Sequence, residues 1–156
     1  MESDSISSES NRVAEHAWRY FDLHAKQRIA LFNFFVLLAA LIVAAWAAAM
    51  TGDTPRPVAA IILACLLSFF SLIFWKIDQR NSFLTKRAEK VLAEAETELP
   101  VGMRLFANEP SETKKAKGGN FIARQWTQGE ALRIVFSLMG FVGVLAGAYA
   151  FATAVS

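Results

Sequence analysis

The chain has 156 residues, is 54% hydrophobic and carries a formal net charge of +2; this length leaves room for one soluble domain at most. The distribution of charge excludes the soluble class. Residues 29–50, 57–75 and 134–156 contain no charged side chain, whereas a surface helix of a soluble protein carries charges along one face. Each run matches the roughly 17–25 residues that cross a bilayer. The sequence therefore predicts an all-α membrane protein with three transmembrane helices.

The N-terminal segment is polar. Residues 1–10 are rich in serine and acidic side chains and are expected to be disordered. Asn11 is a fair N-cap for a helix. After it a helical period of four and three residues follows one face through Val13, Ala17, Tyr20, His24, Gln27 and Leu31. This pattern predicts a helix that runs into the first span. His16 and His24 are eight residues apart, too far along a helix to bind one metal ion, so no metal site and no cofactor are expected.

The first span contains one strongly polar residue, Asn33. An amide inside lipid needs a partner, so Asn33 is expected to face another helix or water, or to reach headgroup water at the interface. Residues 51–57 follow, with two prolines and a glycine that predict a turn. So short a connection makes the first two spans an antiparallel hairpin.

The second span is predicted to continue as a charged helix. No glycine or proline interrupts residues 57–98, and at about 1.5 Å per residue such a helix is roughly 60 Å long. A bilayer core is about 30 Å thick, so half of this helix stands in water as a stalk. Ile77, Leu84 and Val91 recur by sevens along the stalk, with Asn81 in the alternate register position and with neighbours beside them, which are Ala88, Leu92, Ala95 and Leu99. This heptad-like face packs either on the protein's own residues 11–28 or on another subunit.

Charges gather where the two helices of the hairpin leave the membrane. Symmetry about the turn places residue 28 near residue 80, so Arg28 meets Lys76, Asp78 and Arg80. Asp78 is the expected partner of Arg28. The remaining positive charge is neutralised by lipid phosphates or by a polyanionic ligand.

Lysine and arginine predict the orientation in the membrane. Of the 16 such residues, four precede the first span, one lies in the turn, and eleven lie between Lys76 and Arg133. By the positive-inside tendency the N-terminus and the stalk are cytoplasmic, and the turn and Ser156 are outside.

Residues 99–127 are expected to form a cytoplasmic linker with a basic loop. Lys114, Lys115 and Lys117 stand beside a Gly-Gly pair, and Arg124 follows. Mobile lysines of this kind bind a phosphate backbone without reading its sequence, or lie against anionic lipid. The loop is therefore a candidate anion-binding segment.

A capping-box pattern at residues 127–130 (TQGE) opens the third helix, predicted over residues 128–156. Gly140, Gly143 and Gly147 lie on one side of it, with the spacing of a close helix contact. This face either packs on another span or lines a narrow apolar pore. No nucleophile–base set or phosphate-cradling loop is present, so an enzyme is not expected. Three spans cannot enclose a solute path alone, so ion conduction would require a homo-oligomer.

Two segments carry a resemblance: residues 18–28 (WRYFDLHAKQR) leading to 32–35 (FNFF), and residues 74–81 (FWKIDQRN) leading to 86–89 (KRAE). Over residues 11–98, which comprise the cytoplasmic helix, hairpin and stalk, the chain resembles small bacterial membrane effectors of antiphage defence, the SLATT-like and Hailong-type proteins. The third span departs from the two-span SLATT-like plan.

The resemblance implies an oligomeric channel that depolarises the bacterial inner membrane, under the control of a nucleotide or DNA oligomer made by a partner nucleotidyltransferase. Charge and predicted side select the candidate ligand-binding residues. They are Lys86, Arg87, Lys90, Lys114, Lys115, Lys117 and Arg124. The alternative function is a non-conducting membrane anchor whose stalk recruits a soluble partner.

Overall fold

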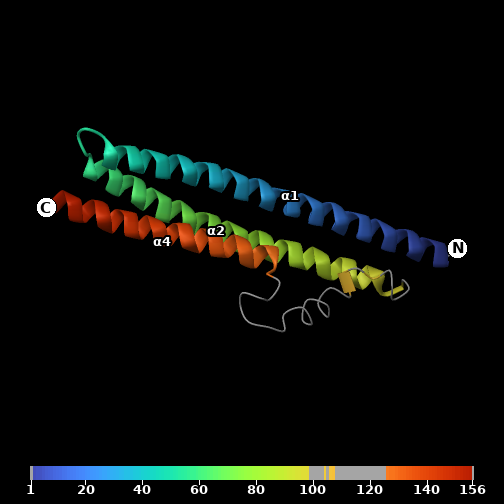
Figure 1. Ribbon diagram of the computed structural model, residues 1–156. Coiled ribbons are helices and arrows are strands. Elements are labelled where there is room, and N and C mark those ends of the chain that lie inside the picture. The colour runs from blue at the N-terminus through green and yellow to red at the C-terminus, as the bar shows by residue number, and fades with distance from the viewer. Residues whose placement is uncertain (1, 99–103, 105, 108–125, 156) are drawn as a thin grey trace. The chain divides into compact units, whose positions relative to one another are not determined.

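The computed structural model describes residues 2–98, 104, 106–107 and 126–155, and every regular element in them is helical. Helix α1 comprises Glu2–Thr51, α2 comprises Pro57–Ala95 and α4 comprises Gln128–Val155; a short 3-10 turn, η1, comprises Glu96–Glu98 (Figure 1). All three long helices are long and apolar enough to cross a membrane. The prediction of an all-α protein with three such helices is confirmed.

Helix α1 starts earlier in the chain than expected. It begins at Glu2, so residues 2–10, expected to be disordered, are helical, and Asn11 lies inside the helix instead of capping it. Adding residues to an existing helix costs far less than nucleating a new one, so a long helix extends readily into a polar flank. Acidic residues in the first turns also suit the positive end of the helix dipole.

The turn between α1 and α2 closes the expected hairpin. The backbone N–H of Arg56 donates to the carbonyl of Ala49 across the turn, at 2.9 Å. Helix α2 then begins at Pro57, a residue suited to the first helical position because its nitrogen has no hydrogen to leave unpaired.

The chain divides into two compact units. The spanning unit comprises residues 28–79 and 128–156, and the stalk unit comprises residues 1–27 and 80–127. Helices α1 and α2 each contribute to both units without a break, whereas α4 belongs to the spanning unit alone.

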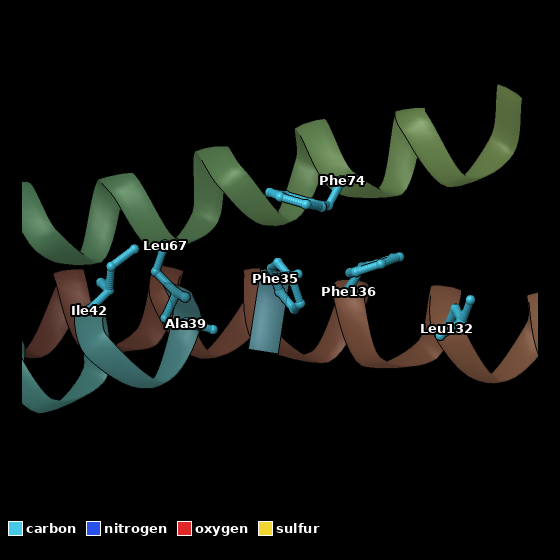
Figure 2. Packing of buried hydrophobic residues seen from close by; sticks show 7 residues of the cluster. All are labelled: Phe35, Ala39, Ile42, Leu67, Phe74, Leu132 and Phe136. Carbon is cyan, nitrogen blue, oxygen red and sulfur yellow. The ribbon is translucent and has the colours of Figure 1, made fainter. Parts of the chain in front are cut away.

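Aromatic side chains fill the centre of the spanning unit. Phe35 of α1 is 1% exposed, and its ring lies 5.3 Å from that of Phe74 in α2 and 4.8 Å from that of Phe136 in α4. Figure 2 shows these rings converging from three helices. The remaining members of the buried cluster are Ala39, Ile42, Leu67 and Leu132. Packed side chains therefore close the space between the three helices at the level of these rings.

The core of the stalk unit is smaller and more polar. Among the residues that the structure describes there, the buried apolar ones are Ala17 of α1 and Ala88 and Leu92 of α2, and the buried polar ones are Asn81, Ser82 and Thr85. Small side chains allow α1 and α2 to approach closely. The contact has little hydrophobic surface to stabilise it.

The buried positions of α2 confirm part of the predicted heptad face, since Asn81, Ala88 and Leu92 are buried, and shift its centre. Ser82 is buried beside a line of positions with an alternating four-three spacing: Ala60, Ala64, Leu67, Ser71, Phe74, Asp78, Asn81, Thr85, Ala88 and Leu92. This is a heptad-type period, but it is centred one residue after the expected one. Leu84 and Val91 are half-buried on its flank, and Ile77 is 36% exposed. The larger side chains lie at the edge because the small residues occupy the line of closest approach.

Candidate functional site

A buried ion pair joins α1 to α2 in the spanning unit. The guanidinium of Arg28 donates twice to Asp78, from Nε to Oδ1 at 2.6 Å and from Nη2 to Oδ2 at 3.2 Å. The side chains are 10% and 4% exposed. The pairing predicted from hairpin symmetry is therefore present, and the two-pronged geometry is the strongest that an arginine and a carboxylate form.

Helix α4 contributes a second cation to the same carboxylate. Nε of Arg133 lies 3.7 Å from Oδ2 of Asp78 and donates to the carbonyl of Gly129 at 3.1 Å. A Cβ at Gly129 would lie 2.6 Å from Nη2 of Arg28. Glycine at this position lets α4 come close to the pair. Asp78 thus connects all three helices at one level.

Sequence reasoning missed the role of Arg133, which it used only as the end of the basic segment that predicts the orientation. The available signal was its position one turn into the third helix, at the same membrane boundary as Arg28 and Asp78. We call Arg28, Asp78 and Arg133 the root cluster. A carboxylate this deeply buried needs such partners, because an unpaired buried charge is very costly.

The other residues expected at the stalk root lie outside this pairing. Lys76 is exposed and its Nζ lies 4.9 Å from the centroid of the Trp75 ring, a cation–π contact. Arg80 is exposed and belongs to the stalk unit. The root cluster therefore has two arginines around one carboxylate, with Lys76 as a further cation of the spanning unit.

The glycine face of α4 packs on α2. Gly143 is buried so close to Ala64 and Ser68 that a Cβ would lie 3.0 Å from the carbonyl oxygen of Ala64. The hydroxyl of Ser68 donates to the carbonyl of Gly140 at 3.1 Å, and a Cβ at Gly147 would meet Ala64 at 3.5 Å. Of the two predicted roles, packing on another span or lining a pore, this face has the first within the protomer, because α2 covers it.

Asn33, by contrast, is exposed on α1 in the spanning unit. Its side chain has no hydrogen-bond partner among the described residues. Of the residues expected to line a pore or a helix contact, it is the one that remains open to lipid, water or another subunit.

The candidate ligand-binding residues divide into two groups. Lys86, Arg87 and Lys90 are exposed on α2 in the stalk unit, with Lys90 3.9 Å from Glu94. Those of the basic loop, Lys114, Lys115, Lys117 and Arg124, lie outside the described residues. The described part of the chain holds no group of three or more His, Cys, Asp or Glu side chains placed to bind a metal ion.

Part of the linker docks on the stalk unit. The ring of Phe106 lies 5.6 Å from that of Phe21 and 6.3 Å from that of Trp18, edge-on to both. The carboxylate of Glu96 accepts hydrogen bonds from the backbone N–H groups of Phe106, at 2.8 Å, and Ala107, at 3.1 Å. Sequence reasoning missed this contact. Two aromatic residues three positions apart on a charged helix were its only signal.

Comparison with known proteins gives two matches. The model of the octameric membrane protein family matches residues 12–152. A protein of Escherichia coli described as CD-NTase-associated protein 19 is 33% identical over 141 residues, which cover 90% of this chain and 91% of that protein. No solved structure matches. With a family model spanning almost the whole chain and a relative of nearly equal extent, this protein belongs to the octameric membrane protein family.

Proposed function

We propose that this protein is the membrane effector of a CD-NTase antiphage system. The observation that carries the proposal is the similarity to a CD-NTase-associated protein over nine-tenths of both chains. CD-NTases are the nucleotidyltransferases of CBASS antiphage systems. The effector is a homo-oligomeric ion channel of the bacterial inner membrane, which depolarises the cell when a cytoplasmic nucleotide or oligonucleotide signal changes. The finer resemblance to SLATT-like and Hailong-type effectors stays a prediction.

The packing of the protomer supports an oligomeric path for ions. Phe35, Phe74 and Phe136 fill the space between its three helices, and the glycine face of α4 is covered by α2. A single chain therefore offers no wet route through its own interior. Only 17%, 28% and 17% of the residues in the most apolar stretches of α1, α2 and α4 are buried, so the outer surface is free for lipid and other subunits. The path in this proposal lies between subunits of an octamer.

The continuity of α1 and α2 supports a route for the signal. Both helices pass unbroken from the stalk unit into the spanning unit, and the root cluster ties them to the start of α4. A ligand held by Lys86, Arg87, Lys90 and the basic loop would move the stalk helices. Asp78 would transmit that movement to Arg133. In this proposal the machinery lies in the cytoplasm and the C-terminus outside, as the positive-inside tendency predicts from the distribution of lysine and arginine.

Flux through liposomes tests the proposal. Purified protein is reconstituted in vesicles with a potassium gradient, and a potential-sensitive dye reports flux before and after addition of the product of the neighbouring CD-NTase. The channel proposal predicts a protein-dependent change of potential that the nucleotide alters. Vesicles that hold verified, assembled protein and pass no current with or without nucleotide would contradict it.

A charge-removal variant tests the signal separately. Replacement of Lys86, Arg87 and Lys90 by glutamine is expected to weaken the nucleotide response by about tenfold or more, because each lost phosphate contact weakens binding. Flux without nucleotide should persist. Arg56→Gln, which removes a cation from the turn between the spans, is the matched control and should keep the full response.

The second candidate function is a non-conducting anchor that recruits a soluble partner. Exposed apolar residues of the stalk unit favour it: Val13 is 51% exposed and Leu23 is 52% exposed. It predicts silent liposomes together with a stoichiometric cytoplasmic partner in pull-downs.

A further inference from the structure

We propose that a second copy of this chain covers one side of the stalk unit, formed by Val13, Tyr20 and Leu23 of α1 and by Leu84 and Val91 of α2. We call this surface the stalk face. The inference rests on the homo-oligomer of the proposed function and deepens it, because it names where subunits meet outside the membrane.

The exposure of these residues needs an explanation that lipid does not supply. In the spanning unit, exposed residues such as Leu37, at 66%, and Val58, at 68%, face a bilayer. The stalk unit has charged residues on both helices, so it stands in water. Val13 and Leu23 nevertheless leave half of their surface open there. Burying such side chains is worth about 1.5–3 kcal/mol each, which favours a partner.

The spacing of the residues gathers them on one side of each helix. Val13 and Tyr20 are seven residues apart on α1 and Leu23 is three further on, so they lie along one flank of the buried Ala17. On α2, Leu84 and Val91 are also seven apart, and each precedes a buried position. The contact line of a helix is the row of its residues that faces the other helix. Viewed from the N-terminus of each helix, all five residues are displaced from this line in the same rotational direction.

Antiparallel geometry then brings the two flanks to the same side of the pair. Two antiparallel helices are exchanged by a local two-fold axis perpendicular to the plane that contains both. This rotation preserves the direction in which a residue is displaced around its helix from the contact line. Flanks with the same offset from the contact line therefore share a side. The pairing of Arg28 with Asp78 sets the levels along the axes. Counting outward from it places Leu23 beside Leu84 and places Val91 within one turn of Val13.

The opposite side of the stalk unit is already occupied. Phe106 packs there against Phe21 and Trp18, held by the carboxylate of Glu96. These residues lie on the other flank of Ala17. The described part of the linker thus covers one side of the pair and leaves the stalk face open.

A second copy is the occupant that the observations favour. Val91 is thirteen residues beyond Asp78 on one helix, about 20 Å further along its axis, which is beyond the reach of lipid. The chain belongs to a family described as octameric, so identical stalk units stand close together. Closed assemblies repeat one set of contacts at every subunit, and a stalk face on each protomer meets that requirement.

Thiol labelling of the purified assembly in detergent tests the inference. In a Cys65→Ser background, Leu23→Cys reports on the stalk face, and Lys86→Cys is the control, because its side chain is exposed on α2 on the flank opposite Leu84 and Val91. In the intact octamer the thiol at position 23 should react with a maleimide at least about tenfold more slowly than the one at 86, since reaction follows exposure. Once the assembly is dissociated, the two rates should converge. Equal rates in the intact octamer would overturn the inference.

A charged substitution gives an independent readout. Leu23→Glu should shift the purified protein from octamer toward smaller species by mass photometry, while Lys86→Gln, on the opposite flank of α2, should leave the octamer intact. The two proposals fail in different ways. An octamer that conducts but shows a freely reactive position 23 contradicts the stalk face alone. An octamer with a protected position 23 and no conductance contradicts the channel alone, and a monomer contradicts both.

Discussion

The spanning unit and the stalk unit are built from the same two helices but differ in how those helices are held. In the spanning unit, α4 joins them, aromatic rings fill the centre, and a buried ion pair closes one end. In the described part of the stalk unit, the buried residues are two alanines, one leucine and three polar residues. Inside lipid, tight packing and buried polar contacts must hold helices together, because lipid supplies no hydrophobic drive to associate them.

This difference suggests a division of work. The spanning unit has an aromatic core, whereas the described residues buried in the stalk unit are mostly small or polar. Regions with few buried contacts open and shift at low free-energy cost. The stalk unit is thus the part in which ligand binding or a neighbouring subunit can change the contact between α1 and α2. The comparison predicts large effects for substitutions in the spanning unit and small ones in the stalk unit.

The largest effect is expected at Asp78. Asp78→Leu leaves the guanidinium of Arg28 buried without a counter-charge, and breaking such a pair costs about 3–5 kcal/mol. Thermal unfolding in detergent should show a strongly lowered transition, or loss of folded protein. The double variant Arg28→Met with Asp78→Leu removes both charges and should recover much of the stability. If the double variant is no better than the single one, the pairing is not what stabilises this end of the unit.

A smaller effect is expected at the glycine face. Gly143→Ala places a methyl group against Ser68 and the carbonyl of Ala64, and overpacking of this kind costs about 1–3 kcal/mol. Gly147→Ala is the matched control, because its added Cβ would meet Ala64 at an ordinary 3.5 Å. Unfolding in detergent should separate the two variants. Equal transitions would mean that α4 does not approach α2 this closely.

In the stalk unit, Glu96→Ala removes two hydrogen bonds to the backbone of Phe106 and Ala107. The loss should cost about 1 kcal/mol and remain local. Hydrogen exchange at these amides should accelerate, and the fluorescence of Trp18 should change as Phe106 leaves it. Glu96→Gln keeps an acceptor and should lie between the variant and the natural protein. Unchanged exchange in Glu96→Ala would show that the carboxylate does not hold the linker.

The smallest effect is expected for the exposed pair of Arg19 and Glu15, whose side chains are 76% and 61% exposed. Arg19→Ala should change the free energy of unfolding by less than about 0.5 kcal/mol, because surface pairs one turn apart are worth little. Its transition should match that of the unaltered protein within error. A large loss would mean that this part of α1 is buried in the assembly.

Much of the candidate site could be predicted from the sequence. Symmetry about a short turn pairs Arg28 with Asp78, and this works because antiparallel helices of equal rise keep their residues in step. The glycines at 140, 143 and 147 predicted a close helix contact because a missing side chain permits one whichever helix is the neighbour. Arg133 and Phe106 could not be assigned in this way, because no short turn sets their register: Phe106 lies within the long linker after α2, and Arg133 follows that linker.

The sequence by itself determined that the chain forms three long helices and which stretches of them are apolar enough to cross a membrane, because these depend on local periodicity and on the cost of placing charge in a bilayer. Tertiary structure decided the rotation of each helix about its axis. It centred the stalk contact line of α2 one residue after Ile77, Leu84 and Val91, and brought Arg133 to Asp78 over Gly129. A shift of one residue turns a helix by about 100°, and only the neighbouring helices select among such rotations.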